Sequence, residues 1–446
     1  MVQQLKRKEE RKVITMKISP LFTALFLGLF ISVSLHGISL AKEQQGDAEV
    51  YNPAGIREDG TYVDTLLTKT IKETKRRGPQ LAGQFPAVKI EKIKIKADAA
   101  TEVNELFYKR GWTDGLPVVV PTPDKVRAML RGTDLDPGFV IAVIDPMGGQ
   151  ATVEKIAVNA VMAGCKAEHM PVLIAAVEAI SDSAFDLKGI SNTTSPDTPL
   201  LVLTGPIIKD IDFNADTNTM GRGRLANSAI GRAIQLIINN VGGAWPGVND
   251  ISNIGSPAEY GMVIGENAEA NPWSSLNSDI GFPKNANVAT LVGVEGIRGV
   301  VGIGRTSEGF LQLVAEHMSG LAAQRPRWPV VILIIAKDTA IQLAKDGWTK
   351  ESMREAILKF GSVPLSKYKE RFNIPRWSHE IQNAEVSATS PDEMIPQPFI
   401  DQFIVLVAGG FGEKSMILPG WFGASKAVSK EIRLPANWQE VIKSGH

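Results

Sequence analysis

The sequence predicts an α/β protein with two lobes and a largely parallel sheet. Apolar strands alternate with amphipathic helices along most of the chain, and several strands end in glycine-rich turns, as at Gly205 and Gly409. The strand predicted at residues 328–336 is apolar throughout, which is typical of a strand covered on both faces of its sheet. At 446 residues the chain is too long for one simple core, which favours two lobes.

The composition is that of an ordinary globular protein and excludes several classes of partner. The formal net charge is zero, 44% of the residues are hydrophobic and 22% are charged. Basic residues are spread along the chain beyond the extreme N-terminus, so nucleic acid is not a predicted partner. The chain has no HxH or HExxH pair, no cysteine cluster and no calcium-loop pattern, so we predict neither a metal site nor a cofactor.

The N-terminus has the order of a secretory signal. The basic segment KRKEERK precedes an apolar run at residues 21–40, and Ala41 offers a small residue for cleavage before Lys42. We expect residues 1–41 to be removed and the chain to be exported, either to a periplasm or out of the cell; Met16 is an alternative start to Met1. The alternative is an uncleaved membrane anchor, because the apolar run is just long enough to span a bilayer.

The remaining chain divides into an extension and the two lobes. Residues 42–98 form a polar, lysine-rich extension in which residues 87–97 alternate apolar and charged side chains, as in an edge strand or extended arm. We expect the first lobe over residues 99–325 and the second over residues 326–446.

Hydrophobic periodicity and the residues that start or end helices predict the elements of each lobe. In the first lobe we expect helices from residues 99, 123, 152 and 171, a long helix opening at residues 221–224 and another at 306–321, with strands at 118–120, 139–145, 200–203 and 289–294. In the second lobe we expect strands at 328–336 and 403–408 and helices at 339–345 and 350–360. The segment YKRGWTD at residues 108–114 is echoed by AKDGWTK at 344–350, a hint of internal duplication.

The long helix after residue 224 carries an unusual polar face. Its polar residues recur at spacings of three and four and include no acid, so they can receive an anion or a carbonyl-rich partner. Alternatively, the face forms a buried polar contact between helices, or its arginines pair with Asp210, Asp212 or Asp216. The residues of this face are Arg224, Asn227, Ser228, Arg232, Gln235 and Asn239.

Two loops add candidate residues. Residues 242–283 are rich in glycine, asparagine and proline, and loops of this length are usually functional; they contain Glu266 and Glu269. The turn Gly409-Gly410 leads to Lys414-Ser415 and is similar to a phosphate loop, but Glu413 occupies the position where that motif needs glycine. A nucleoside triphosphatase is therefore not predicted.

Three further side chains have both a chemical and a structural interpretation. Asp114 follows a glycine turn, where a carboxyl group serves either as a general acid/base or as a turn residue. Lys155 would be an acid/base group if desolvated, although lysines at such positions are more often exposed. Cys165, the only cysteine, follows a helix C-terminus, which raises a thiol pKa; it is either buried and inert or, with His169 nearby, a reactive thiol.

Five sequence blocks stand out over about residues 99–421: GWTDGLPVVVPT, VEKIAVNAVMAGC, RLANSAIGRA, NVGGAWPG and the late AGGFGEKS with PGW. In these blocks the chain resembles a bacterial family of mostly hypothetical proteins, some with loose thiol-redox associations. The resemblance implies that these blocks converge on a site, but it brings no reaction. The chain lacks a CxxC or selenocysteine-type pair, which puts a thiol–disulfide role in doubt, and its export signal departs from cytosolic members.

Together these features predict an exported enzyme acting on a small anionic or carbonyl-bearing molecule in a cleft between the lobes. Arg224, Asn227 and Arg232 would orient the anion, and Glu266, Lys155 or Asp114 would transfer protons. The alternatives are a solute-binding or interaction protein with the same pocket, and a thiol-dependent function through Cys165. The cleft would be bounded by Gly205, Gly409, Gly410 and Lys414, with Trp245, Trp273 and Trp421 as apolar walls. The oligomeric state is left open.

Overall fold

The computed structural model describes residues 46–51, 90–95, 99–302, 304–322, 327–371, 390–396, 398–423 and 425–445. The chain forms two compact units, Met1–Ala48 with Lys94–Ala99 and Glu49–Ile93 with Ala100–His446. The predicted signal segment, residues 1–41, lies outside the described residues. Strand β1 (Gly46–Tyr51) and strand β2 (Ile90–Ile95) form a two-stranded sheet, so the strand expected within residues 87–97 is confirmed. Nearly all the other described elements belong to the second unit.

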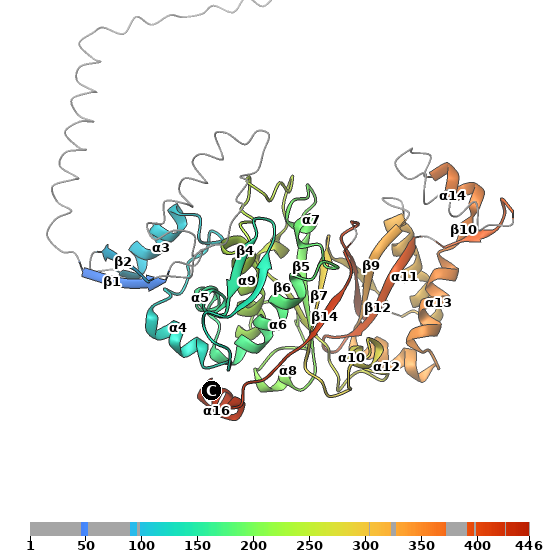
Figure 1. The fold of residues 1–446 in the computed structure, drawn as a ribbon. Helices are drawn as coiled ribbons and strands as arrows, with labels where there is room; N and C mark the ends of the chain where they lie inside the picture. The colour runs from blue at the N-terminus through green and yellow to red at the C-terminus, as the bar shows by residue number, and fades with distance from the viewer. Residues whose placement is uncertain are drawn as a thin grey trace, which may run out of the picture. The chain divides into compact units, whose positions relative to one another are not determined.

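Mixed helices and sheets confirm the α/β class, and two four-stranded sheets organise the described part of this unit (Figure 1). The first sheet has the order β14-β7-β5-β6, with β14 at Val428–Glu431, β7 at Val288–Val294, β5 at Thr198–Thr204 and β6 at Met262–Gly265. The second sheet has the order β12-β9-β13-β8, with β12 at Phe399–Val407, β9 at Arg327–Ile335, β13 at Lys414–Pro419 and β8 at Arg298–Val301.

The sheets pack on each other and carry helices on their outer faces. Side chains of the first sheet, such as Leu200 and Ile264, share one apolar core with Ile334 and Leu406 of the second sheet. Helices α6 (Met170–Ile180) and α9 (Leu225–Asn240) pack on the first sheet. Helices α11 (Ser307–Ala322), α12 (Lys337–Lys345) and α13 (Lys350–Phe360) share a second core with the other face of β9. The apolar strand at residues 328–336 is therefore covered on both faces, as expected.

The prediction of a largely parallel sheet is wrong. Only β5 with β6 and β9 with β12 are parallel pairs; within these two sheets the other described pairs are antiparallel. The reason is that burial on both faces does not require helices on both sides. Here each sheet is covered by helices on one face and by the other sheet on the opposite face. A strand with antiparallel neighbours is therefore as fully buried as a strand with parallel neighbours would be.

The two sheets share one connectivity. In the first sheet the central strand β5 pairs in parallel with β6 and antiparallel with β7, both of which follow it in the sequence. In the second sheet β9 pairs in the same way, in parallel with β12 and antiparallel with β13. The edge strands cross over: β8 follows β7 in sequence but pairs with β13, and β14 follows β13 but pairs with β7. The crossing point is held by the backbone, where Trp421 N donates to Gly293 O at 2.8 Å.

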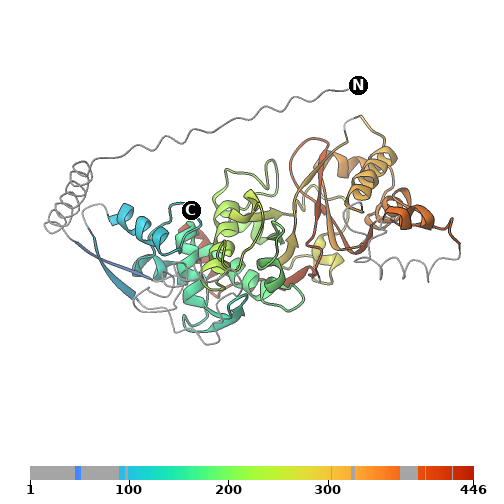
Figure 2. The same cartoon turned by 90° about the horizontal axis from the view of Figure 1, so that it is seen from above.

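The helices largely agree with the sequence expectations. The described helices of eight or more residues are α3 (Ala99–Lys109), α4 (Pro123–Leu130), α5 (Val153–Ala163), α6 (Met170–Ile180), α9 (Leu225–Asn240), α11 (Ser307–Ala322), α12 (Lys337–Lys345), α13 (Lys350–Phe360) and α16 (Trp438–Gly445). The shorter ones include α7 (Leu187–Ser191), α8 (Ile207–Asp210), α10 (Leu276–Asp279) and α14 (Leu365–Arg371). Figure 2 shows the same arrangement from above.

Three local expectations change. Residues 118–120 form no strand; Val119 N instead donates to Met162 O of α5. Strand β3 (Val140–Ile144) pairs only with β4 (Gly149–Thr152), as a hairpin outside the two sheets. The loop predicted at residues 242–283 contains strand β6, which pairs with β5. With only four residues, β6 is too short to give a recognisable strand pattern in the sequence.

The two echoing segments form the same helix ending. After α3, Trp112 N donates to Phe107 O and Gly111 takes φ +69°; after α12, Trp348 N donates to Leu343 O and Gly347 takes φ +86°. This is a Schellman cap, in which a left-handed glycine closes the helix and the next residue packs back on it. Helix α3 precedes the central strand β5 whereas α12 follows β9, so the echo marks a shared cap rather than equivalent positions.

Candidate functional site

A cavity of about 650 Å³ lies along α9, and we call it the α9 pocket. Its walls come from the end of α3 and the Gly111–Gly115 turn, from α7 and the residues before β5, and from the loop that leads from α9 to the 3₁₀ helix η3 (Pro257–Tyr260). Helix α9 contributes Gln235 and Asn239, the C-terminal half of its predicted polar face. A pocket of this size suits a small molecule.

Polar contacts, from buried to exposed, assemble these walls. Arg232 of α9 donates to both carboxylate oxygens of Asp114, at 2.7 and 2.8 Å, and to Pro117 O at 2.9 Å. Asn240 of α9 donates to Trp112 O at 3.0 Å and to Asn159 Oδ1 at 2.8 Å. The blocks GWTDGLP, VEKIAVNAVMAGC and RLANSAIGRA are therefore tied together beside the pocket.

The electrostatics of the pocket are set by carboxyl groups. Asp114, Asp197, Asp250 and Glu259 all line it. Burial and the nearby Asp250 carboxylate raise the pKa of Glu259, while a hydrogen bond from Ser256 N opposes the shift. A carboxyl group whose pKa is raised holds a proton closer to neutral pH, which is what a general acid/base requires.

Aromatic rings complete the lining. Tyr108 and Tyr260 are 66% and 51% exposed at the pocket, whereas Trp245 is only 3% exposed. The indole N–H of Trp245 has no hydrogen-bond acceptor among the described residues. Of the predicted site residues, the structure thus brings Asp114 and Trp245 together here.

A second cavity of about 650 Å³ opens at the carboxyl ends of β6, β9 and β12. The predicted residues Gly409, Gly410 and Lys414 line it, opposite residues 217–221. Its floor is apolar, and the glycine turn offers few amides to an anion: Gly409 N donates to Ala215 O and Gly412 N to Asp338. Gly205 lies apart, against Ala286 and Asn287.

The predicted anion-binding residues are engaged by other parts of the chain. Arg224 forms an exposed ion pair with Asp212 at 2.8 Å, the structural alternative that the sequence left open. Asn227 clamps the preceding loop, because its side chain accepts from Asn214 N and donates to Asn214 O and Thr219 O. Arg232 binds Asp114, so these three side chains do not meet at one ligand position.

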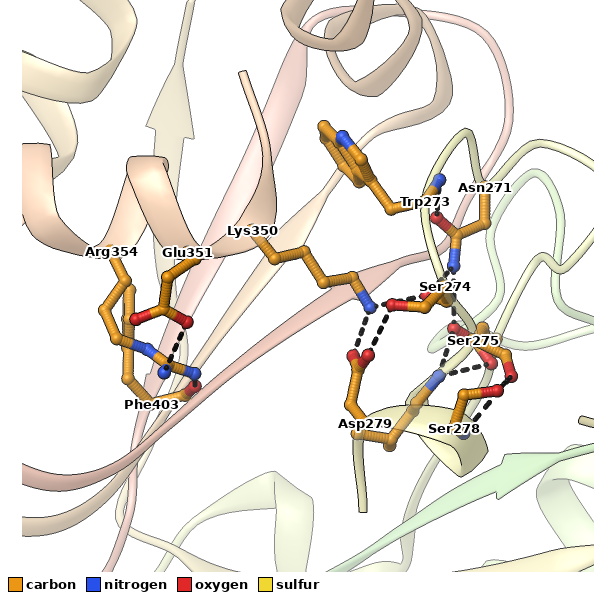
Figure 3. Close-up of polar contacts among 12 residues, drawn as sticks. Asn271, Trp273, Ser274, Ser275, Ser278, Asp279, Lys350, Glu351, Arg354 and Phe403 are labelled. Carbon is orange, nitrogen blue, oxygen red and sulfur yellow. Dashed lines mark hydrogen bonds and ion pairs between the residues drawn. The ribbon is translucent and has the colours of Figure 1, made fainter. Parts of the chain in front are cut away.

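Glu266 is buried in a structural role. Its carboxylate accepts from Leu276 N at 3.0 Å and from Asn271 Nδ2 at 3.0 Å, and burial raises its pKa. The surrounding loop is fastened to the start of α13, where Lys350 pairs with Asp279 (Figure 3). The Trp273 indole also donates to Trp348 O, in the turn before α13, at 2.8 Å. Glu266 and Trp273 line neither of the cavities described above. Glu269 is exposed and pairs with Lys209.

Lys155 is buried, contrary to the usual position of such lysines. Its ammonium donates to Gln150 O at 3.0 Å, and desolvation lowers its pKa to about 8. Thr152 caps α5 by accepting from Lys155 N. Lys155 does not line the α9 pocket.

Cys165 lines a third cavity, of about 400 Å³, together with Lys125, Arg131 and Lys166. Burial, reinforced by Glu168, raises the pKa of its thiol well above the usual range. His169 is buried, whereas Cys165 is only partly buried. Desolvation and Lys166 lower the pKa of His169 to about 3, and its Nδ1 accepts from Lys166 N. Neither group is ionised at neutral pH, which favours the inert interpretation of Cys165.

Sequence reasoning missed most of the charged lining of the α9 pocket. Asp197, Asp250, Glu259 and the tyrosines come from four segments that only the fold joins. One signal was present: Ser256-Pro257-Ala258-Glu259 has the spacing of a capping box, and in the structure Ser256 and Glu259 do cap η3. That pattern fixes the position of the Glu259 carboxyl group.

Within the described residues, no group of three or more His, Cys, Asp or Glu side chains is placed to hold a metal ion. No helix in the described part of the chain has the length and apolarity to cross a membrane. A scan against models of protein families matches none of them, and a search of curated proteins finds no match.

Proposed function

We propose that this chain is an exported enzyme that binds a small molecule in the α9 pocket and uses general acid–base chemistry on it. Glu259 is the proton-transferring group. Burial is the main cause of its raised pKa, and Asp250 is the positioning residue that raises it further. Tyr108, Tyr260 and Trp245 form the binding wall. The export signal at residues 1–41 supports an extracytoplasmic site of action.

One observation carries the proposal: two carboxyl groups share the pocket and one of them has a raised pKa. Burial raises the pKa of Glu259 most, like-charge repulsion from Asp250 raises it further, and a hydrogen bond from Ser256 N opposes both. Pairs of titratable groups whose environments push their pKa values apart are a common arrangement of acid and base catalysts. Glu266 and Lys155 also have shifted pKa values, but neither lines this pocket.

A second candidate function is ligand binding without chemistry in the same pocket. It is favoured by the capping role of Glu259, whose Oε1 accepts from Ser256 N at 3.0 Å. A carboxylate held by a backbone N–H is well suited to fix a ligand, whether or not a proton moves.

An untargeted turnover assay separates the two. The full chain and Glu259→Gln are incubated with a defined mixture of small metabolites, and mass spectrometry follows consumption, product formation and retained ligand. The enzyme consumes a component that Glu259→Gln binds but leaves unchanged. Retention of the same component, unchanged, by both proteins supports the binding function, and equal turnover by both contradicts the role of Glu259.

We also propose that the described fold is two-lobed and duplicated, one lobe around each sheet, with exchanged edge strands. The shared connectivity around β5 and β9 supports this, as does the reciprocal pairing of β8 and β14. Superposition of β5, β6 and β7 on β9, β12 and β13 tests it. A duplicated unit places the outer helices of both sheets in register, and outer helices that do not superpose contradict it.

A further inference from the structure

We propose that the ligand of the α9 pocket carries a positively charged ammonium group. This inference rests on the proposed function, because it concerns the same pocket. It replaces the anion expected from the sequence, since Arg224 and Arg232 bind Asp212 and Asp114 and neither lines the pocket.

The first step is charge. Asp250 and Glu259 have no cationic partner among the described residues; their carboxylates accept from Ser252 N and Ser256 N, each at 3.0 Å. The ammonium of Lys109, which lines the same pocket, pairs instead with Glu105 at 3.8 Å. The pocket therefore presents carboxylate charge that the described chain leaves without a cation, and a ligand cation would remove the repulsion between the two acids.

The second step is the aromatic wall. Tyr108, Tyr260 and Trp245 line the pocket together with these acids. Ammonium groups are attracted to the faces of aromatic rings, and sites for such ligands combine aromatic side chains with carboxylates. A ligand with a negative charge would meet neither attraction here.

Isosteric probes test the inference. Choline carries an ammonium group and a hydroxyl; 3,3-dimethyl-1-butanol has the same shape without the charge, and 3,3-dimethylbutyrate is a matched anion. Calorimetric titration of the full chain should show choline binding at least about tenfold more tightly than either carbon analogue. Asp250→Asn keeps the acceptor for Ser252 N and should lose this preference, whereas Glu308→Gln, an exposed acid outside the pocket, should retain it.

The outcomes distinguish this inference from the proposed function. Equal binding of choline and its neutral analogue, tighter binding of the anion, or no binding of choline overturns the ammonium assignment. If Tyr260→Ala then abolishes binding of the preferred probe, the α9 pocket is still supported as the ligand-binding site. Choline binding that needs Asp250, with turnover unaffected by Glu259→Gln, supports the ligand class and overturns the catalytic function.

Discussion

The guanidinium group of Arg232 binds the carboxylate of Asp114 through two hydrogen bonds, at 2.7 and 2.8 Å, across 118 positions of sequence. The pair is mostly buried, with side-chain exposures of 17% and 7%. It fixes the Gly111–Gly115 turn against α9 and so builds one wall of the α9 pocket. The sequence suggested Arg232 for ligand binding and Asp114 for proton transfer. In the structure the two residues instead bind each other and hold the wall of the pocket in place.

Replacing Arg232 should destabilise the fold far more than replacing Arg224. Arg232→Ala leaves the buried Asp114 carboxylate unpaired, which should cost about 2–4 kcal/mol of unfolding free energy. Arg224→Ala, the matched control, breaks an exposed pair with Asp212 and should cost less than about 1 kcal/mol. Urea denaturation of both variants measures the difference, and equal costs would contradict the structural role of Arg232.

The Schellman cap after α12 should make Gly347 intolerant of a side chain. Gly347→Ala meets no atom within 4 Å, yet its φ of +86° is strained for alanine and should cost about 1–2 kcal/mol. Gly296→Ala also has open space but no left-handed backbone, so its effect should stay within about 0.5 kcal/mol. Thermal unfolding compares the two; an equally mild effect at Gly347 would mean that the cap relaxes.

The thiol of Cys165 should react slowly while the protein is folded. Burial and Glu168 raise its pKa, so little thiolate forms at pH 8. Labelling with a disulfide reagent should be at least about 100-fold slower in the folded chain than in guanidinium chloride. The Cys165→Ser variant measures background labelling. Equally fast labelling of the folded and unfolded chains would contradict the inert interpretation and favour the thiol-dependent function.

His169 should make the fold less stable in mild acid. Its pKa is lowered from 6.5 to about 3 in the folded state, so between these values the unfolded chain binds the proton and the folded chain does not. Stability should therefore fall as pH drops from about 6.5 toward 3, by about 1–2 kcal/mol at pH 5. Urea midpoints at pH 7 and 5 measure this, and His169→Asn should show a smaller drop; an unchanged drop would assign the effect to other groups.

Much of the local structure could be predicted from the sequence, because short-range interactions decide it. The start of α5 at Thr152 and its end at Gly164, and the glycine turns after α3 and α12, depend on residues within a few positions of each other. The apolar strand at residues 328–336 likewise depends on its own composition. For the site, sequence reasoning identified Asp114 and Trp245 but gave no reason to join them to Asp250 and Glu259.

By itself, then, the sequence determined the α/β class and most of the helices and long strands. Only the tertiary structure decided that strands pair in mixed directions, that β8 pairs with β13 and β14 with β7, and that Asp250 lies near Glu259. The physical reason is the range of the interactions. A cap or an apolar face depends on neighbours along the chain, whereas strand partners and the pKa of a carboxyl group depend on groups that only folding brings together.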